Sequence, residues 1–238
     1  MANPTPFEPA STAWVVAGGA ATTPAGRTVL VAGASGLVGR AILLGLLTDD
    51  SVAAVHALDR RNVPELQHPK LTRHTVDFKA LPALPRADEA FIALGTTIKV
   101  AGSKDAFRTV DFHAVVAAAK GAQAAGVKRV GLVSAMGANA GSSVFYNRVK
   151  GEVEDALSAM GFETLVIARP SFLAGDREAL GQPKRSGEAI ALGVSRALAP
   201  LIPDNYKSID AGDVARALLD AVPKRLGRIV LMSSGMRS

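Results

Sequence analysis

Short apolar segments alternate with longer amphipathic ones along most of the chain. Thr28–Ala32 is an almost continuous apolar run, typical of a strand covered on both faces of a parallel sheet. Further strands are expected at Val52–Leu58, Leu71–Phe78, Phe91–Leu94, Arg129–Ser134, Thr164–Ala168 and Arg228–Met232. Helical spacing covers Leu37–Leu47, Asp105–Ala125, Asn147–Met160 and Asp213–Val222. This alternation predicts an α/β fold, a doubly wound parallel sheet of Rossmann type with a small C-terminal region covering the substrate.

The same pattern divides the chain into an extension and one domain. Residues 1–26 are rich in Ala, Thr, Pro and Gly and have little periodicity, so we expect a flexible extension. Residues 27–238 are expected to form a single domain, with 171–208 as the segment on the substrate side. No apolar run approaches the roughly 18 residues that span a bilayer, and no basic segment precedes the apolar stretch 14–21, as a secretory signal requires. We therefore expect a cytoplasmic protein with no membrane partner.

The amino-acid composition excludes several classes of functional site. The 238 residues are 48% hydrophobic and 20% charged, as in soluble globular proteins, and include no cysteine. This excludes disulfides, thiolate metal sites and cysteine nucleophiles, and the four histidines have no metal-ligand spacing. The net charge of +6 permits an anionic partner, but the arginines are scattered and no recognition-helix motif accompanies them, so no nucleic-acid partner is expected.

A glycine-rich segment follows the first predicted strand and opens a helix. Gly33–Gly39 has the spacing G-x-x-G-x-x-G, and glycines there let the backbone turn tightly and approach a pyrophosphate. The free N–H groups and the positive dipole end of the following helix attract the phosphates. The segment predicts a dinucleotide site; the alternative is a tight strand–helix turn with no ligand.

The second predicted strand is followed by acidic and basic residues together. An acid at this position usually binds the ribose 2′-hydroxyl of NAD, whereas an arginine accommodates the 2′-phosphate of NADP. Asp59 supplies the first and Arg60 and Arg61 the second. Because two guanidinium groups match a dianionic phosphate, NADP(H) is favoured and NAD(H) stays possible. The alternative interpretation is a solvated charged turn.

Three residues suggest acid–base chemistry. Tyr146 and Lys150 are four apart on a predicted helix and therefore share one face. A free phenol ionises near pH 10, and a neighbouring ammonium stabilises the phenolate. Ser134 ends the preceding strand, at the edge where ligands bind, and its hydroxyl would hold a substrate oxygen beside Tyr146. The alternative is that Tyr146 and Lys150 are ordinary helix surface.

These motifs resemble the short-chain dehydrogenases/reductases. The resemblance rests on Gly33–Gly39, Ser134 and Tyr146–Lys150, and it extends from about Thr28 to the C-terminus. Within that family the chain is most similar to the atypical, NAD(P)H-binding, Tat-interacting-protein-like branch. The segments that indicate this branch are Leu94–Thr97, Val110–Asp111, Gly151–Glu154, Arg169–Pro170 and Asp176–Glu178.

The resemblance implies roles for individual residues. Tyr146 would be the proton donor or acceptor, and Lys150 would bind the nicotinamide ribose and tune Tyr146. The pyrophosphate would lie against Gly33, Ser35, Gly36, Leu37 and Val38. The adenosine ribose would face Arg60 and Arg61, and the adenine would face Asp77 and Phe78. The remaining cofactor contacts would come from Leu94, Gly95 and Thr96 and, near the nicotinamide, from Pro170 and Ser171.

Two departures from the family pattern stand out. Asp111 occupies the position at which many members carry an asparagine that supports a proton relay, and Ser171 stands where relatives often carry glycine. The leading hypothesis is an NAD(P)(H)-dependent oxidoreductase acting on a carbonyl or alcohol substrate, as a monomer or homodimer. The alternatives are a non-catalytic NADPH-binding sensor and, less favoured because the C-terminal segment is short, a sugar-nucleotide epimerase.

Overall fold

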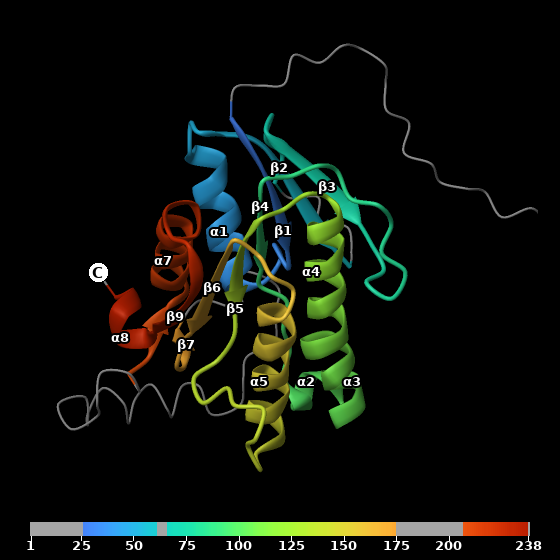
Figure 1. Cartoon of the computed structure of the whole chain (residues 1–238), viewed down its shortest axis with the longest axis vertical. Helices are drawn as coiled ribbons and strands as arrows, with labels where there is room; N and C mark the ends of the chain where they lie inside the picture. The colour runs from blue at the N-terminus through green and yellow to red at the C-terminus, as the bar shows by residue number, and fades with distance from the viewer. Residues whose placement is uncertain (1–25, 61–65, 175–206, 238) are drawn as a thin grey trace, which may run out of the picture.

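A single parallel sheet organises the molecule. The computed structural model describes residues 26–60, 66–174 and 207–237. Seven parallel strands lie in the order β3-β2-β1-β4-β5-β6-β9 (Figure 1). Their bounds are β1 Arg27–Ala32, β2 Val52–Asp59, β3 Leu71–Thr75, β4 Glu89–Ile92, β5 Arg129–Val133, β6 Thr164–Arg169 and β9 Gly227–Met232. The strand order reverses between β1 and β4, and ligands bind at such a switch point, outside the carboxyl ends of the strands. The predicted fold class is confirmed.

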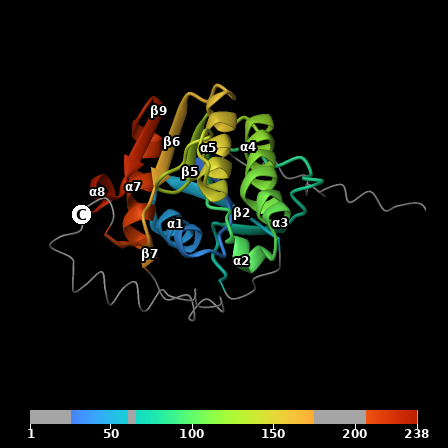
Figure 2. The same ribbon diagram turned by 90° about the horizontal axis from the view of Figure 1, so that it is seen from below.

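Helices cover both faces of this sheet (Figures 1 and 2). One face carries α1 (Leu37–Thr48) and α7 (Ala211–Lys224), with the short α8 (Ser233–Met236) beside them. The other face carries α4 (Val115–Ala124) and α5 (Phe145–Ser158). Two short helices, α2 (Ile98–Ala101) and α3 (Lys104–Arg108), and a π-helical turn, η1 (Thr109–Ala114), lead into α4. A two-stranded sheet joins β7 (Leu173–Ala174) to β8 (Ile209–Asp210).

The core consists of two apolar layers, one on each side of the sheet. In β1, Val29 and Val31 pack toward α1 and α7, whereas Leu30 and Ala32 pack toward α4 and α5, and all four are buried. Because both faces of the strand are covered, its sequence shows no polar alternation. Burial on both faces therefore explains why the sequence of β1 is almost continuously apolar, as predicted.

Two expected elements differ from the observed ones. The helix expected over 105–125 is interrupted, because α3 is followed by the π-helical turn η1 before α4 begins. A π-helical turn inserts an extra residue into the helical repeat and often marks a functional site. The third strand ends at Thr75 rather than at Phe78, and the other element ends shift by a few residues, as helix and strand termini commonly do.

The terminal and substrate-side predictions fall largely outside the described residues. Residues 1–25, Arg61 and 175–206 lie there, so the flexible extension and most of the substrate segment stay predictions. The described residues on either side of 175–206 are nevertheless held in place by hydrogen bonds. The Ser171 amide donates to Ser233 Oγ (2.7 Å), and the Ile209 amide donates to the Phe172 carbonyl (2.9 Å). Both ends therefore lie beside the carboxyl end of β6. Among the described helices, none combines the length and apolarity required to cross a bilayer.

Candidate functional site

The phosphate loop lies where β1 and β4 diverge. Gly33 has φ +90°, and a Cβ on it would lie 2.8 Å from the backbone of Ala93, just after β4. A Cβ on Gly39 would lie 2.0 Å from the Gly33 carbonyl oxygen. Only glycine therefore allows the first turn of α1 to pack this closely against the loop.

The start of α1 is open to a ligand. Gly36 is the N-cap and offers no side-chain acceptor to the helix amides, and the first turn contains no acidic residue. The first N–H groups of a helix lack intrahelical partners and carry the positive end of the dipole. An uncapped helix start behind a glycine loop, at the switch point of the sheet, fits the pyrophosphate of a dinucleotide.

Asp59, at the end of β2, is turned into the protein. Its side chain is 3% exposed, and its Oδ2 lies 2.7 Å from Nη1 of Arg73, on β3. Burial raises the pKa of the Asp59 carboxyl, although Arg73 and the Ser35 amide of the phosphate loop both act to lower it. The next residue, Arg60, is exposed. The two charges that the sequence places side by side are thus separated, one inward and one toward solvent.

A buried ion pair forms at the end of β4. Nζ of Lys150 lies 2.8 Å from Oδ1 of Asp111, and their side chains are 7% and 0% exposed. The other oxygen, Oδ2, accepts the Thr96 amide at 2.8 Å. A Cβ on Gly95 would lie 3.3 Å from Asp111 and 3.6 Å from Lys150. The π-helical turn η1 therefore brings Asp111 to the carboxyl end of the sheet, where it fixes both Lys150 and the loop after β4.

Tyr146 lies one helical turn before Lys150 on α5. Its half-buried ring packs against Phe107 of α3, with the ring centroids 5.5 Å apart. Phe107 is fully buried, so it provides a fixed wall for the phenol. Lys150, Asp111 and Gly95 therefore lie together, and Tyr146 precedes Lys150 by one turn of the same helix, as the spacing of the two residues predicted.

Ser134 contacts a different residue from the one expected. Its hydroxyl donates to Oε1 of Glu154 at 2.6 Å, and both residues are buried. Arg169, at the end of β6, donates to the same carboxylate from Nε (2.9 Å) and Nη2 (2.5 Å). Because the single hydroxyl proton points to Glu154, Ser134 does not present a donor toward Tyr146 in this structure.

The remaining predicted cofactor residues lie in different surroundings. Phe78 and Leu94 are buried in the apolar layer under α4, whereas Asp77 is exposed. Pro170 is buried, and its carbonyl accepts the Met136 amide at 2.9 Å, which joins the loops after β5 and β6. The Ser171 hydroxyl bonds the Lys207 carbonyl. The structure brings these residues to the carboxyl side of the sheet, but Phe78 and Leu94 serve the core there.

Three residues that shape the site were missed. Glu154 follows Lys150 by four residues, so helical spacing would have placed it on the same face. Gly151 lets the loop after β5 cross α5, because a Cβ there would lie 2.1 Å from the Ala140 nitrogen. Arg73 gave no sequence signal, since its partner Asp59 lies on a different strand.

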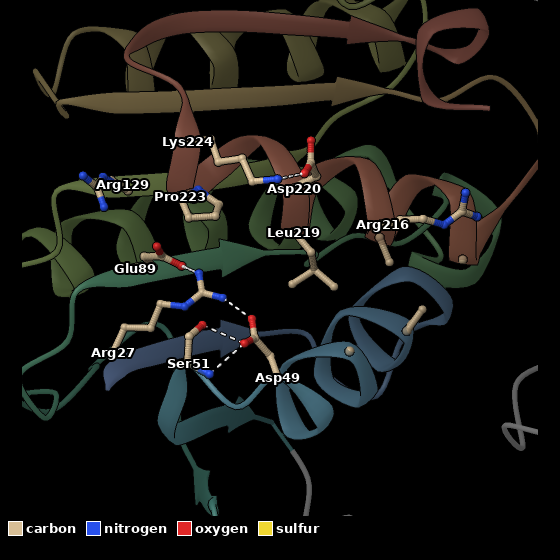
Figure 3. Close-up of a pocket in the computed structure, with 14 residues that line it drawn as sticks. Arg27, Asp49, Ser51, Glu89, Arg129, Arg216, Leu219, Asp220, Pro223 and Lys224 are labelled. Carbon is tan, nitrogen blue, oxygen red and sulfur yellow. Dashed lines mark hydrogen bonds and ion pairs between the residues drawn. The ribbon is translucent and has the colours of Figure 1, made fainter. Parts of the chain in front are cut away.

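A separate cleft opens at the opposite edge of the sheet, where the strands begin (Figure 3). It encloses about 720 Å³ between α1 and α7. At its base Arg27 bonds both Asp49 and the buried Glu89, the latter at 2.7 Å. These charges satisfy one another, and the cleft is remote from the phosphate loop. We therefore assign the candidate site to the carboxyl edge.

Comparisons with known proteins identify relatives of this chain. No protein-family model matches the chain. Rat Protein HTATIP2 is 34% identical over 203 residues, covering 82% of this chain and 80% of the relative. Protein fmp52, mitochondrial, of Aspergillus clavatus is 35% identical over 207 residues, covering 83% and 88%.

Solved structures show the same fold at low identity. MoeE5 in complex with UDP-glucose and NAD has a TM-score of 0.64 at 19% identity, covering 87% of this chain and 76% of that one. A short chain dehydrogenase family protein from Francisella tularensis has a TM-score of 0.64 at 13% identity, covering 89% and 99%. This chain thus shares its Rossmann-like α/β fold with these two solved proteins. By sequence, the chain belongs to the family of the HTATIP2 and Fmp52 proteins.

One expectation is contradicted by these relatives. Several fungal members of the family are named mitochondrial proteins, which overturns the expectation of a cytoplasmic protein. That expectation rested on the missing pattern of a secretory signal. Such a pattern separates secreted proteins from the rest and does not distinguish the cytoplasm from the mitochondrion.

Proposed function

We propose that the protein is an NADP(H)-dependent oxidoreductase that uses Tyr146 as its acid–base. The observation that carries this proposal is the buried Lys150–Asp111 pair one helical turn from Tyr146, at the carboxyl end of β4. A buried ion pair costs desolvation free energy and is weak evidence for stability alone. Its position at the switch point, beside Gly95, where a side chain would crowd the pair, supports a catalytic use.

Each residue has a defined task in this proposal. The amides at the start of α1 would hold the pyrophosphate, and Gly33 and Gly39 let the loop pack closely against the residue after β4 and the first turn of α1. The Tyr146 hydroxyl gives a proton to a carbonyl oxygen in reduction, or takes one from an alcohol in oxidation. Lys150 supplies positive charge beside Tyr146 and hydroxyl contacts to the nicotinamide ribose, and Asp111 holds Lys150 in place. A bound nicotinamide would supply or accept the hydride.

The preference for NADP(H) is supported by Asp59 and Arg60. An acid that recognises the ribose diol of NAD has to present its oxygens to the cofactor. Asp59 is instead buried and paired with Arg73, whereas Arg60 is exposed and available to a 2′-phosphate. A guanidinium group is well suited to such a phosphate.

A second candidate function is favoured by Ser134. If its hydroxyl stays bonded to Glu154, the site lacks one substrate contact, and the protein could bind NADPH as a sensor without turnover. The two candidates predict the same cofactor binding and differ in chemistry.

The test uses the full-length protein and the Tyr146→Phe variant. We expect the wild type to bind NADPH and to consume it with at least one member of a panel of aldehydes and ketones. The variant keeps the ring packed on Phe107 and should bind NADPH equally well, while its turnover falls about 10²- to 10⁴-fold. Full activity of the variant contradicts the proposed role. NADPH binding with no turnover across the panel, or across alcohols with NADP⁺, favours the sensor.

A further inference from the structure

Arg73 takes no part in the proton or hydride transfer proposed above, but it forms an ion pair with Asp59 at the end of β2. It lies on β3, at the edge of the sheet (Figure 1), and pairs in register with Ala57, two residues before Asp59. Both side chains project from the α1 side of the sheet, so Arg73 reaches diagonally to the Asp59 carboxylate, with Nη1 2.7 Å from Oδ2.

The pair is well buried. The Arg73 side chain is 17% exposed and that of Asp59 is 3% exposed. Among the described residues, Nε of Arg73 has no hydrogen-bond partner, so the pair is not completed by a wider network on that side. Burying two charges in this way is costly, and a hydrophobic pair of similar volume would often be equally stable.

The position of Asp59 gives this pair a functional meaning. An acid at the end of the second strand normally accepts the ribose hydroxyls of NAD. A backbone hydrogen bond from Ser35 of the phosphate loop acts to lower the pKa of Asp59, and the Asp59 side chain is only 3% exposed. An unpaired carboxylate at this place would also repel a 2′-phosphate.

We propose that Arg73 is a specificity-determining, positioning residue that selects NADP(H) over NAD(H) by holding Asp59 in a buried ion pair. The pair acts twice: it removes the carboxylate oxygens from the ribose diol, and it cancels the charge that would repel the 2′-phosphate. This inference rests on the proposed function, because it presumes that the dinucleotide binds at the carboxyl edge with its adenosine near Asp59.

Replacing Arg73 should therefore change cofactor choice. In Arg73→Gln the carboxylate loses its counter-ion, and turning outward restores its solvation and exposes it to the ribose. We expect the ratio of the NADPH and NADH dissociation constants to shift roughly tenfold or more toward NADH, as a nearby unpaired charge predicts. The measurement is a fluorescence or calorimetric titration of full-length protein with each cofactor.

Arg27→Gln is the matched control. Arg27 is also 17% exposed and also pairs with a nearly buried acid, Glu89, but at the opposite edge of the sheet. Its loss should destabilise the fold and leave the ratio of the two dissociation constants unchanged. Asp59→Asn in the Arg73→Gln background removes the exposed charge and should restore the preference for NADPH.

The possible results separate the inference from the proposed function. A wild type that binds neither cofactor overturns both. A wild type that prefers NADPH, with an Arg73→Gln variant that weakens both cofactors equally or neither, overturns only the role of Arg73. If Arg73→Gln does not fold, the single Asp59→Asn variant decides: the inference expects NADH affinity within about threefold of the wild type, because Asp59 does not contact the ribose, and a selective loss of NADH binding overturns it.

Discussion

Buried ion pairs form at both edges of the sheet, but the backbone around them differs. At the carboxyl edge, Asp59 pairs with Arg73 and Asp111 pairs with Lys150. At the amino edge, Glu89 and Asp49 both pair with Arg27, and Glu89 is as fully buried as the acids at the other edge. What differs is the backbone. At the carboxyl edge, glycines and an uncapped helix start lie near the ion pairs. At the amino edge, the ion pairs lie where the strands begin and line a cleft.

The volume of a cleft does not single out the site that we propose for the dinucleotide. The amino-edge cleft of about 720 Å³ has charged groups that are already matched, and it lacks an open helix start (Figure 3). The carboxyl edge provides unpaired backbone donors together with a phenol and an ammonium. A dinucleotide needs such donors for its phosphates, so we place the proposed site by the chemistry of the lining residues rather than by cavity size.

The largest expected effect is a difference in NADPH binding between alanine substitutions at two glycines of α1. Gly39→Ala should abolish NADPH binding, because its Cβ would lie 2.0 Å from the Gly33 carbonyl oxygen and the loop would have to move. Gly45→Ala faces the amino-edge cleft, where the Cβ would meet only the flexible end of Leu219 at 2.5 Å. It should cost at most about 1–3 kcal/mol of stability and leave NADPH affinity intact. Titration and thermal unfolding of both variants check this, and equal losses of binding would break the distinction between the edges.

The next effect compares an acid at each edge. Asp111→Asn leaves the ammonium of Lys150 buried without a counter-ion and should lower the free energy of unfolding by about 3 kcal/mol. Asp49→Asn removes a carboxylate that is 37% exposed, from an arginine that keeps Glu89, and should cost about 1 kcal/mol or less. Urea unfolding at pH 7 measures both. Similar losses in the free energy of unfolding would show that the Lys150–Asp111 pair stabilises the fold no more than a surface ion pair does.

The smallest effect concerns two histidines on the neighbouring strands β2 and β3. His56 on β2 and His74 on β3 lie 2.9 Å apart (Nδ1 to Nε2), and burial lowers the pKa of both below the usual 6.5. Because the unfolded chain binds more protons between the lowered pKa values and 6.5, the histidines should not affect stability above pH 6.5. Stability should fall as the pH drops from 6.5 to the lowered values and level off below them. The slope should reach at most about 1.4 kcal/mol per pH unit for each histidine.

Unfolding free energies measured between pH 7.5 and 5 check this slope. His74→Gln removes one titrating group and should make the slope shallower, whereas His113→Gln, at an exposed position of η1, should leave it as in the wild type. NADPH selectivity should stay constant in both variants, because the His74 side chain lies on the opposite face of β3 from Arg73 and His113 is exposed on η1. An unchanged slope in His74→Gln would refute the assignment.

Much of the fold and part of the site were predictable because their signals are local. The two-sided apolar run of β1 and the glycines after it predicted the sheet and the phosphate loop, and the spacing of Tyr146 and Lys150 placed them on one helix face. Predictions failed where the signal was not local. A helical repeat does not reveal the π-helical turn η1, and the apolar character of Phe78 does not distinguish a core position from a wall of the adenine site.

By itself, therefore, the sequence determined the order of strands and helices, the glycine loop and the residues able to carry acid–base chemistry, because periodicity and spacing act within a few residues of chain. Only the tertiary structure decided which polar and charged side chains form hydrogen bonds and ion pairs with one another. Ser134 contacts Glu154 20 residues away, and Asp59 contacts Arg73 14 residues away on the neighbouring strand. Such pairs depend on strand register and helix packing, and the energy of a buried charge depends on its partner far more than on its neighbours in the chain.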